Sequence, residues 1–434
     1  MTKVKSNGFK LILNKSTFFI LLATLIASLS ELIFQYLILN YIEVESVANI
    51  SLTLNVIKFL TVLGCLGTHI YLLQSLAKFG KYGIDYLKFS YKLTFLVSIS
   101  FSLILVYLLQ HINLSFELKT LLYLSAFQIP LRVLLMICQS INQYEKRYKR
   151  LSHFHHLPIT LKLIILLSLV AYFDFIDSKI IIWSINLSLI IISLYNLAQI
   201  ISSYNGTLIY QNIADNTKNH INNIHDSFKN NFKKLLPYWY SQISSTLYMI
   251  VPLFVVSNQM SLYETGLFAF VLIIIQLLNL APTVILNKLF QARLLILFEN
   301  DFPEFKKIYF KIRSYSIYFA FLIIAPSLLF YIDIITFLFN NKYELIYPLI
   351  YFYILFLPIK FTDIVQSVVM HSESMINMKY KILNMGVLFL ITSMTIAIPL
   401  YGLLGAFVSY LISDFLVFVI NYSVINRTIN KKYL

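Results

Sequence analysis

Six ionisable side chains fall inside long apolar stretches of this sequence. The first half of the chain holds Glu31, Lys58 and Arg132, and the second half holds Lys360, Asp363 and Asp414. A charged side chain inside a bilayer is costly, so it is retained mainly where it faces a protein interior or an aqueous cavity. Each of the six is therefore a candidate functional residue. The chemistry that they predict is binding of a charged solute within the membrane.

The two cations of the first half suit an anionic head group. The guanidinium of Arg132 offers a planar fork that matches phosphate oxygens, and the ammonium of Lys58 adds a point charge. An equally weighted alternative is that one of them pairs with Glu31 and only holds helices together. The sequence leaves both interpretations open.

Uncharged polar side chains accompany these charges at helical spacing. Asn55 stands three residues before Lys58, while Gln128 and Gln139 form a stripe with Arg132 on one predicted helix. Such faces are typical of a helix that borders water inside a membrane protein. We therefore add the three amides to the candidate head-group site.

The charges of the second half allow two roles. Lys360 and Asp363 are three residues apart, so they are expected to neutralise each other on one helix, although Lys360 remains a candidate for the head group. Glu31 and Asp414, with Asp363 as a further candidate, could carry a coupling ion. A desolvated carboxylate can load and release a proton or Na⁺ as a cavity opens to either side.

The composition requires a membrane protein. Apolar residues make up 59% of the 434 residues and charged residues only 12%, against roughly 45–50% and 25% in soluble domains. A backbone in lipid must satisfy its own hydrogen bonds, so the spans must be helical. Twelve apolar runs are long enough to cross: 17–39, 47–70, 93–110, 118–140, 157–173, 180–202, 238–257, 266–286, 315–332, 345–369, 382–400 and 404–425.

The two halves of the chain repeat each other. The pair Glu45–Ser46 recurs as Glu264–Thr265, 219 residues later, and the run Ile129–Arg132 recurs as Leu357–Lys360, 228 residues later. Duplicated helical halves are a common way to build a carrier, because two lobes can rock about a central site. We therefore predict an all-α integral membrane protein with two pseudo-symmetric six-helix lobes around a central cavity.

The predicted lobes are residues 1–203 and 237–434, joined by a linker over residues 204–236. Apolar residues at helical spacing from Ile221 to Leu235, with lysines between them, predict either an interfacial helix or a flexible linker. Both remain open at this stage.

The charge distribution predicts the orientation. With the amino terminus inside, 28 of the 34 Lys and Arg residues, Lys162 among them, fall in segments assigned to the cytoplasmic side. Both termini are therefore expected in the cytoplasm. Orientation also explains the formal net charge of +15, so we do not predict nucleic-acid binding.

No enzymatic or metal chemistry is indicated. Cys65 and Cys138 lie in predicted spans, and the cluster His153, His155 and His156 lacks cysteine or carboxylate partners at ligand spacing. The outer loops are short, which counts against a membrane glycosyltransferase or polysaccharide polymerase. We expect no metal and no cofactor beyond a coupling ion, H⁺ or Na⁺.

The sequence resembles the Wzx-type polysaccharide flippases of the multidrug/oligosaccharidyl-lipid/polysaccharide (MOP) exporter superfamily. The resemblance rests on the twelve-span plan, on the turn Leu63–Gly67, on Ile129–Arg132 with Gln139, and on Phe339–Tyr343. Members of this kind carry cationic residues in a cavity of the amino-terminal lobe. Lys58 and Arg132 are the positions that match.

The resemblance implies a flippase, not an enzyme, in a bacterial inner membrane. Its substrate would be an undecaprenyl-pyrophosphate-linked oligosaccharide, moved to the outer leaflet for O-antigen or capsule synthesis, and polysaccharide assembly proteins would be candidate partners. A cation-coupled multidrug exporter of the same superfamily is the alternative, and its cavity should be dominated by carboxylates if its substrates are cationic.

Overall fold

The computed structural model describes most of the chain. The described residues are 15–72, 84–144, 148–173, 175–204, 228–286, 290–291, 294, 297–298, 301–339, 342–372 and 374–431. The last part of the predicted linker is helical and continuous with the following pass, because α9 begins at Phe228. The amino-terminal part of the proposed interfacial helix, before Phe228, lies outside the described residues.

Thirteen helical elements carry the fold of the described residues. The first half holds α1 (Lys15–Tyr41), α2 (Val44–Cys65), α4 (Ile84–His111), α5 (Phe116–Ser125), α6 (Gln128–Tyr144), α7 (Tyr148–Phe173) and α8 (Ser178–Tyr204). The second half holds α9 (Phe228–Gln259), α10 (Leu262–Ile285), α12 (Phe302–Phe339), η5 (Glu344–Ile346), α13 (Tyr347–Val369) and α14 (Ile376–Lys431).

The helices are those of a multi-pass membrane protein. Ten described helices are long and apolar enough to cross a membrane, and the pair α5–α6, bent by 43°, is an eleventh candidate pass. The twelve passes predicted from the sequence are reached only when this pair counts as one pass and α14 as two.

The helix α14 folds back on itself. Its 56 residues would extend about 84 Å if straight, nearly three times the hydrocarbon thickness of a bilayer. Gly402 interrupts it with φ 58°, a left-handed conformation that glycine adopts without a Cβ penalty. The two halves then lie side by side, because the hydroxyl of Ser413 donates to the carbonyl of Gly386 at 3.1 Å.

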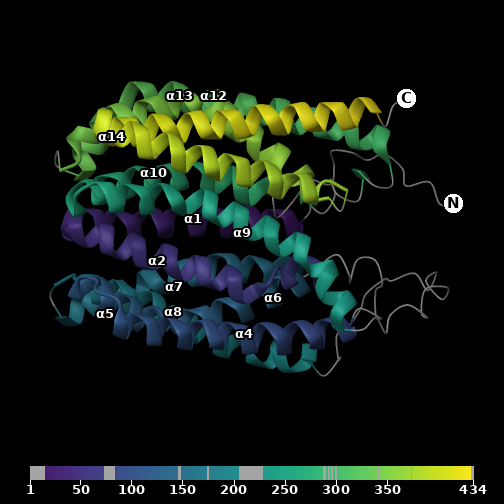
Figure 1. Cartoon of the computed structure of the whole chain (residues 1–434), viewed down its shortest axis with the longest axis horizontal. Coiled ribbons are helices and arrows are strands. Elements are labelled where there is room, and N and C mark those ends of the chain that lie inside the picture. The colour runs from purple at the N-terminus through teal and green to yellow at the C-terminus, as the bar shows by residue number, and fades with distance from the viewer. Residues whose placement is uncertain are drawn as a thin grey trace.

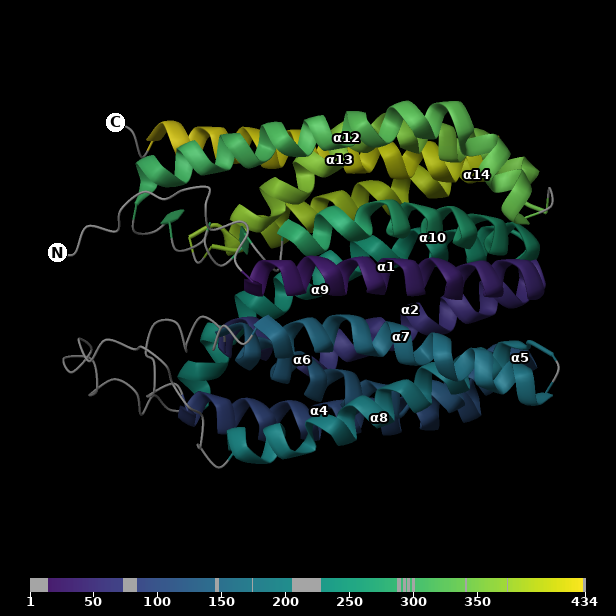
Figure 2. The ribbon, with the colours of Figure 1, turned by 180° about the vertical axis from the view of Figure 1, so that it is seen from behind.

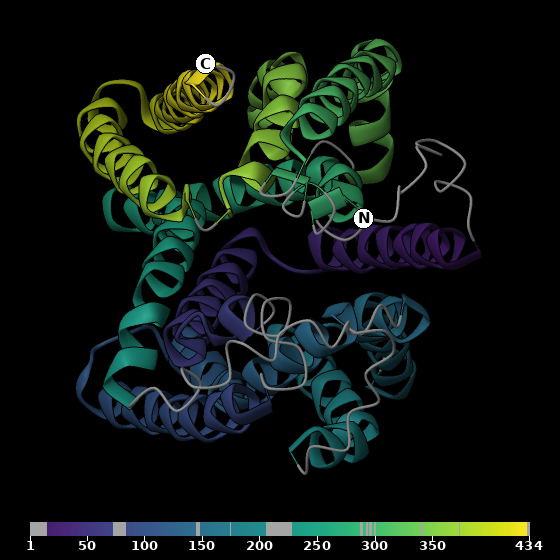
Figure 3. The same ribbon diagram turned by 90° about the vertical axis from the view of Figure 1, so that its right-hand side faces the viewer.

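The helices form two bundles, one from each half of the chain. Figures 1 and 2 show α4 to α8 on one side and α12 to α14 on the other, with α1, α2, α9 and α10 between them. We call the end where α1 begins and α14 ends the proximal end, and the opposite end the distal end. Figure 3 looks along the helices and shows the two bundles side by side. The internal repeat is visible here, since Glu45 and Glu264 occupy the first turns of α2 and α10.

The carboxyl end of α1 is capped by the other bundle. The last carbonyls of a helix have no partner within it. Lys342 donates to the carbonyl of Leu39 at 3.0 Å and to that of Ile42, and the hydroxyl of Tyr343 also donates to Leu39 at 3.0 Å. Burial lowers the pKa of Lys342, and the nearby carboxylates of Glu43 and Glu45 at the start of α2 oppose this shift.

Close packing adds to the contacts of Lys342 and Tyr343 with the end of α1, and together we call these contacts the distal seal. The ring of Phe270 stacks on Tyr343 at 4.0 Å between centroids, and the amide of Asn40 donates to the carbonyl of Leu338 at 2.7 Å. A Cβ at Gly266 would clash with the backbone carbonyl of Val44 and lie 2.6 Å from its Cγ1. The two bundles are thus joined at the distal end without room for a larger side chain.

The proximal end has a separate contact between the bundles. Gly67, at φ 69°, follows the end of α2 in the Leu63–Gly67 turn, and a Cβ there would lie 2.6 Å from the amide nitrogen of Trp239 on α9. Nearby, Gln242 hydrogen-bonds to His69 at 2.9 Å. The turn picked out in the sequence is therefore a point where the two bundles approach closely.

Candidate functional site

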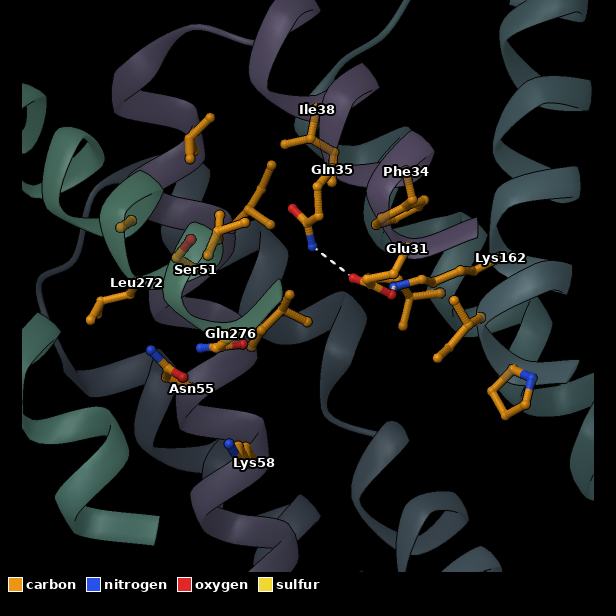
Figure 4. Close-up of a pocket in the computed structure, with 18 of the residues that line it drawn as sticks. Glu31, Phe34, Gln35, Ile38, Ser51, Asn55, Lys58, Lys162, Leu272 and Gln276 are labelled. Carbon is orange, nitrogen blue, oxygen red and sulfur yellow. Dashed lines mark hydrogen bonds and ion pairs between the residues drawn. The ribbon is translucent and has the colours of Figure 1, made fainter. Parts of the chain in front are cut away.

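A cavity lies between the two bundles. Its volume is about 340 Å³, near the lower limit of roughly 300–1,000 Å³ for small-molecule sites. Its walls come from α1, α2, α6, α7 and α8 of the first bundle and from α9 and α10 of the second. Figure 4 shows polar side chains from several of these helices pointing into it.

Four ionisable side chains line the cavity, one from each of four helices. They are Glu31 of α1, Lys58 of α2, Arg132 of α6 and Lys162 of α7. Three cations against one anion leave the lining with a formal charge of +2. Glu31, Lys58 and Lys162 lie well inside their helices, and Arg132 is the fifth residue of α6, just beyond the bend of the α5–α6 pass. Carrier sites commonly lie near the middle of a pass.

The single carboxylate is paired. Lys162 Nζ lies 2.6 Å from Glu31 Oε2, and the amide of Gln35 donates to Glu31 Oε1 at 2.8 Å. The Lys162 ammonium also lies over the ring of Phe34, 4.1 Å from its centroid. The side chains of the pair are 15% and 18% exposed, so they border the cavity and are not sealed away from it.

This pair corrects two expectations. The charge count assigned Lys162 to a cytoplasmic segment, but the residue belongs to the middle of α7 and lines the cavity. The ion pair considered for Glu31 with Lys58 or Arg132 is instead made by Lys162. The position of Lys162 inside the predicted span 157–173 was the signal that could have identified it as a residue of the cavity.

The other two cations have no carboxylate within ion-pair distance among the described residues. Lys58 Nζ is placed 3.6 Å from the sulfur of Met249, a weak acceptor, and the positive charge of Arg132 acts on it across the cavity. Arg132 donates through Nε and Nη2 to Gln128 Oε1, at 3.2 and 2.9 Å. Both cations are thus available to an anion that enters the cavity.

The predicted amides have different places. Asn55 lines the cavity one turn before Lys58 (Figure 4). Gln128 is fully buried behind Arg132 and donates to Asn186 at 2.6 Å, so it positions the guanidinium and does not line the cavity. Gln139 follows Arg132 by two helical turns toward the proximal end and is not among the lining residues.

The charges of the second half lie elsewhere. Lys360 Nζ is 2.7 Å from Asp414 Oδ2, and Asp363 accepts from the amide of Asn421 at 3.3 Å. None of these residues lines the cavity. The expected local pair of Lys360 with Asp363 is therefore replaced by an ion pair between α13 and α14, because the helices bring Asp414 to Lys360 across the bundle.

The internal repeat and the Lys360–Asp414 ion pair show how the two lobes differ in charge. Arg132 and Lys360 occupy matching positions of the internal repeat. Lys360 is neutralised by Asp414, which is only 4% exposed, whereas Arg132 has an amide as its acceptor. The same repeat position thus carries a charge paired with a carboxylate in the second lobe and, in the first, a charge beside the cavity that pairs with no carboxylate of the described residues.

The Lys360–Asp414 ion pair is expected to stabilise the folded protein. Lys360→Met leaves the buried carboxylate of Asp414 without its cation, and breaking a buried pair in this way costs about 3–5 kcal/mol. We expect a lower melting temperature in detergent, measured by fluorescence-detected size exclusion. The matched double variant Lys360→Met/Asp414→Leu, which removes both charges, should recover most of the loss. Equal melting temperatures for the wild type and Lys360→Met would refute a structural role.

The fold is that of known transporters. No protein-family model matches this chain, and no curated protein matches it. Among solved structures, it is similar to an outward-facing multidrug resistance MATE family transporter of the MOP superfamily, with a TM-score of 0.68 and 14% identity over 98% of both chains. An inward-facing MATE family transporter gives a TM-score of 0.67 and 12% identity, covering 97% of this chain and 96% of the other.

A third structure of the same fold has a differently charged pocket. It is a MOP superfamily transporter from Pyrococcus furiosus, described by a reverse polarity of its binding pocket that suggests a different function. The TM-score is 0.67 with 11% identity, and the match covers 96% of this chain and 95% of the other. The predicted all-α fold of this superfamily is thereby confirmed.

Proposed function

We propose that this protein is a MOP-superfamily flippase, not an enzyme, and that its substrate is an undecaprenyl-pyrophosphate-linked oligosaccharide. The observation that carries the proposal is the pair Lys58 and Arg132 in a cavity between the lobes, two cations for which the described part of the chain offers no carboxylate partner. Buried cations are costly unless they are compensated. A bound anion supplies that compensation.

The charge of the lining fits the head group. A pyrophosphate in such a lipid carries about two negative charges, which cannot cross hydrocarbon unaided, whereas the polyprenyl tail is stable in lipid. The three cations and one anion of the cavity offer a matching excess of two positive charges. Asn55 and Gln276 add uncharged hydrogen-bonding groups for sugar hydroxyls. Lys360 has its own carboxylate and has no part in this proposed site.

The proposed orientation puts the proximal end in the cytoplasm. Lys and Arg concentrate in the segments that meet this end, as the positive-inside rule requires. Both termini are then cytoplasmic, in a bacterial inner membrane. Outward movement of an anion is favoured by a negative interior, by roughly 2.3 kcal/mol per charge per 100 mV.

Alternating access follows from the two lobes. The chain is about equally similar to outward-facing and inward-facing MATE transporters, with TM-scores of 0.68 and 0.67. The distal seal between α1, α10 and the region of Lys342 and Tyr343 closes one end of the lobe interface. We propose that this seal breaks when the loaded cavity opens outward, and that polysaccharide assembly proteins receive the product there.

A coupling ion is part of the proposal. Glu31 is the carboxylate that lines the cavity, so it is the first candidate to bind H⁺ or Na⁺. Asp414 and Asp363 remain candidates in the second lobe, where Asp414 is held by Lys360 and Asp363 by an amide.

A cation-coupled multidrug exporter is the second candidate function. The fold of the MATE transporters and the presence of Glu31 in the cavity favour it. The excess of cations in the same cavity opposes it for cationic drugs, because like charges repel. A membrane glycosyltransferase or polymerase is the least favoured function.

Depletion in the native bacterium tests the proposed function. When expression is shut off, lipid-linked oligosaccharide should accumulate in the inner leaflet and surface polysaccharide should fall, as measured by extraction of labelled lipid and by surface staining. Wild-type protein supplied in trans should reverse both effects, and Lys58→Ala/Arg132→Ala at the same membrane level should not. Unchanged lipid-linked sugar after depletion would exclude the flippase and leave the exporter.

A further inference from the structure

The proposed function gives no role to the ion pair between Glu31 and Lys162. It lines the same cavity as Lys58 and Arg132, and both of its side chains retain some exposure. A pair that only joined α1 to α7 would be expected to be sealed in the packing between these helices. This pair instead presents a lysine to the space where an anion would bind.

We infer that Lys162 is a third contact for the phosphate of the head group, and that head-group binding displaces Glu31, which then takes up one proton. This inference rests on the proposed function. Before binding, the carboxylate of Glu31 occupies the position of an anion beside Lys162. Its oxygens are acceptors of the same kind as those of a phosphate, so the two compete for one ammonium group.

The size of the cavity brings the competitors together. At about 340 Å³, the cavity is small for a head group with sugars, and Lys58, Arg132 and Lys162 all line it. A head group that fills it therefore meets all three cations. The ring of Phe34 keeps the Lys162 ammonium at the cavity wall. Two of the three cations need no rearrangement to bind, and the third becomes available when its carboxylate partner leaves.

The displaced carboxylate has few other partners. After the exchange, Glu31 retains the amide of Gln35, which is uncharged, and faces a phosphate. A carboxylate in that environment is more stable with a proton bound, because burial and a neighbouring negative charge both disfavour the ionised form. The proton comes from the buffered solvent and reaches Glu31 through water in the cavity. The ionisable groups that face Glu31 in the cavity are Lys162 of α7, Lys58 of α2 and Arg132 of α6.

The exchange makes affinity depend on pH. Because binding takes up a proton, affinity for the anion should fall as the pH rises, by at most about tenfold per pH unit. By the same linkage, a higher proton concentration favours binding of the anion.

Calorimetric titration of the purified protein with farnesyl pyrophosphate tests the inference. Heats measured at one pH in two buffers of different ionisation enthalpy give the number of protons taken up. We expect about one proton for the wild type and none for Glu31→Gln. Glu31→Gln should also bind severalfold more tightly, since it no longer competes for Lys162. Lys162→Ala should bind about tenfold more weakly, the loss of one charge-assisted contact, and Lys162→Arg should retain most of the affinity.

A control variant and two kinds of contrary result distinguish failure of this inference from failure of the proposed function. Lys179→Ala removes an exposed positive charge at the distal start of α8 and should bind as the wild type does. Wild-type binding without proton uptake, together with unchanged affinity in Glu31→Gln, would overturn the exchange and leave the flippase proposal intact. If the wild type does not bind the probe, or if Lys58→Ala/Arg132→Ala binds it equally well, the proposed function itself fails and the exchange fails with it. Glu31→Gln and the wild-type proton count decide the question even if Lys162→Ala does not fold.

Discussion

Removing both Lys58 and Arg132 from the cavity should weaken binding of farnesyl pyrophosphate about 100-fold or more. A hydrogen bond to a charged group is worth about 1.5–3 kcal/mol, and tenfold in affinity corresponds to about 1.4 kcal/mol. The loss of Lys58 and Arg132 together therefore amounts to about 3–6 kcal/mol. Both side chains line the cavity and have no carboxylate partner among the described residues, so their alanine variants leave no anion exposed.

Conservative variants separate charge from geometry. Arg132→Lys keeps the charge but loses the planar fork, so we expect an affinity between those of the wild type and Arg132→Ala. Gln128 Oε1 would then lose the hydrogen bond that it now accepts from the Arg132 guanidinium at 2.9 Å. Lys179→Ala serves again as the control for a change in total charge. Binding of the double variant within about twofold of the wild type would remove both residues from the substrate site.

The second large effect concerns the distal seal. Gly266→Val places a branched side chain against the backbone of Val44, where even a Cβ lies 2.6 Å from the Val44 Cγ1. Overpacking of this kind costs about 1–3 kcal/mol, which corresponds to a shift of about 5- to 150-fold in the balance between closed and open seals. We expect the distal end to open.

Cysteine labelling measures this opening. Ile346 is fully buried in the seal, so Ile346→Cys should react slowly with a membrane-impermeant maleimide in an otherwise unchanged chain. The native residues Cys65 and Cys138 are buried as well. Adding Gly266→Val should raise the rate of labelling by at least about fivefold, and adding Lys342→Ala should raise it in the same direction, because the α1 carbonyls lose their cap.

A matched glycine variant controls for overpacking in general. A Cβ at Gly386 would lie 2.7 Å from Val417 Cγ2, but this contact is inside the second bundle and away from the seal. Gly386→Ala should leave labelling of the distal cysteine unchanged. Equal labelling rates with glycine and with valine at position 266 would show that the α2–α10 approach does not control the distal end.

The fold follows largely from the sequence. Composition and the lengths of the apolar runs require membrane helices, and the recurrence of Glu45 as Glu264 marks the starts of α2 and α10. The two passes predicted over residues 382–400 and 404–425 are the two halves of α14, and Gly402, where the helix turns, lies in the gap between them. The left-handed conformation of that glycine does not follow from hydropathy.

Three residues that line the cavity could be picked out from the sequence, because each stands out on a single helix. Glu31, Lys58 and Arg132 were found because a charge inside an apolar run is unusual in itself, and all three line the cavity. Their partners could not be predicted, because the contacts that link Glu31 to Lys162 and Lys360 to Asp414 cross between helices. Spacing along one helix reports local neighbours and contains no information about which helices meet.

Transport by the purified protein tests the central claim most directly. In liposomes that contain it, a fluorescent short-chain prenyl pyrophosphate carrying a disaccharide should move from one leaflet to the other, as measured by quenching with dithionite. Lys58→Ala/Arg132→Ala should reduce this movement to the level of empty liposomes, because the two cations that face the cavity are gone. No movement of the lipid by the wild type, with uptake of a cationic dye instead, would contradict the account.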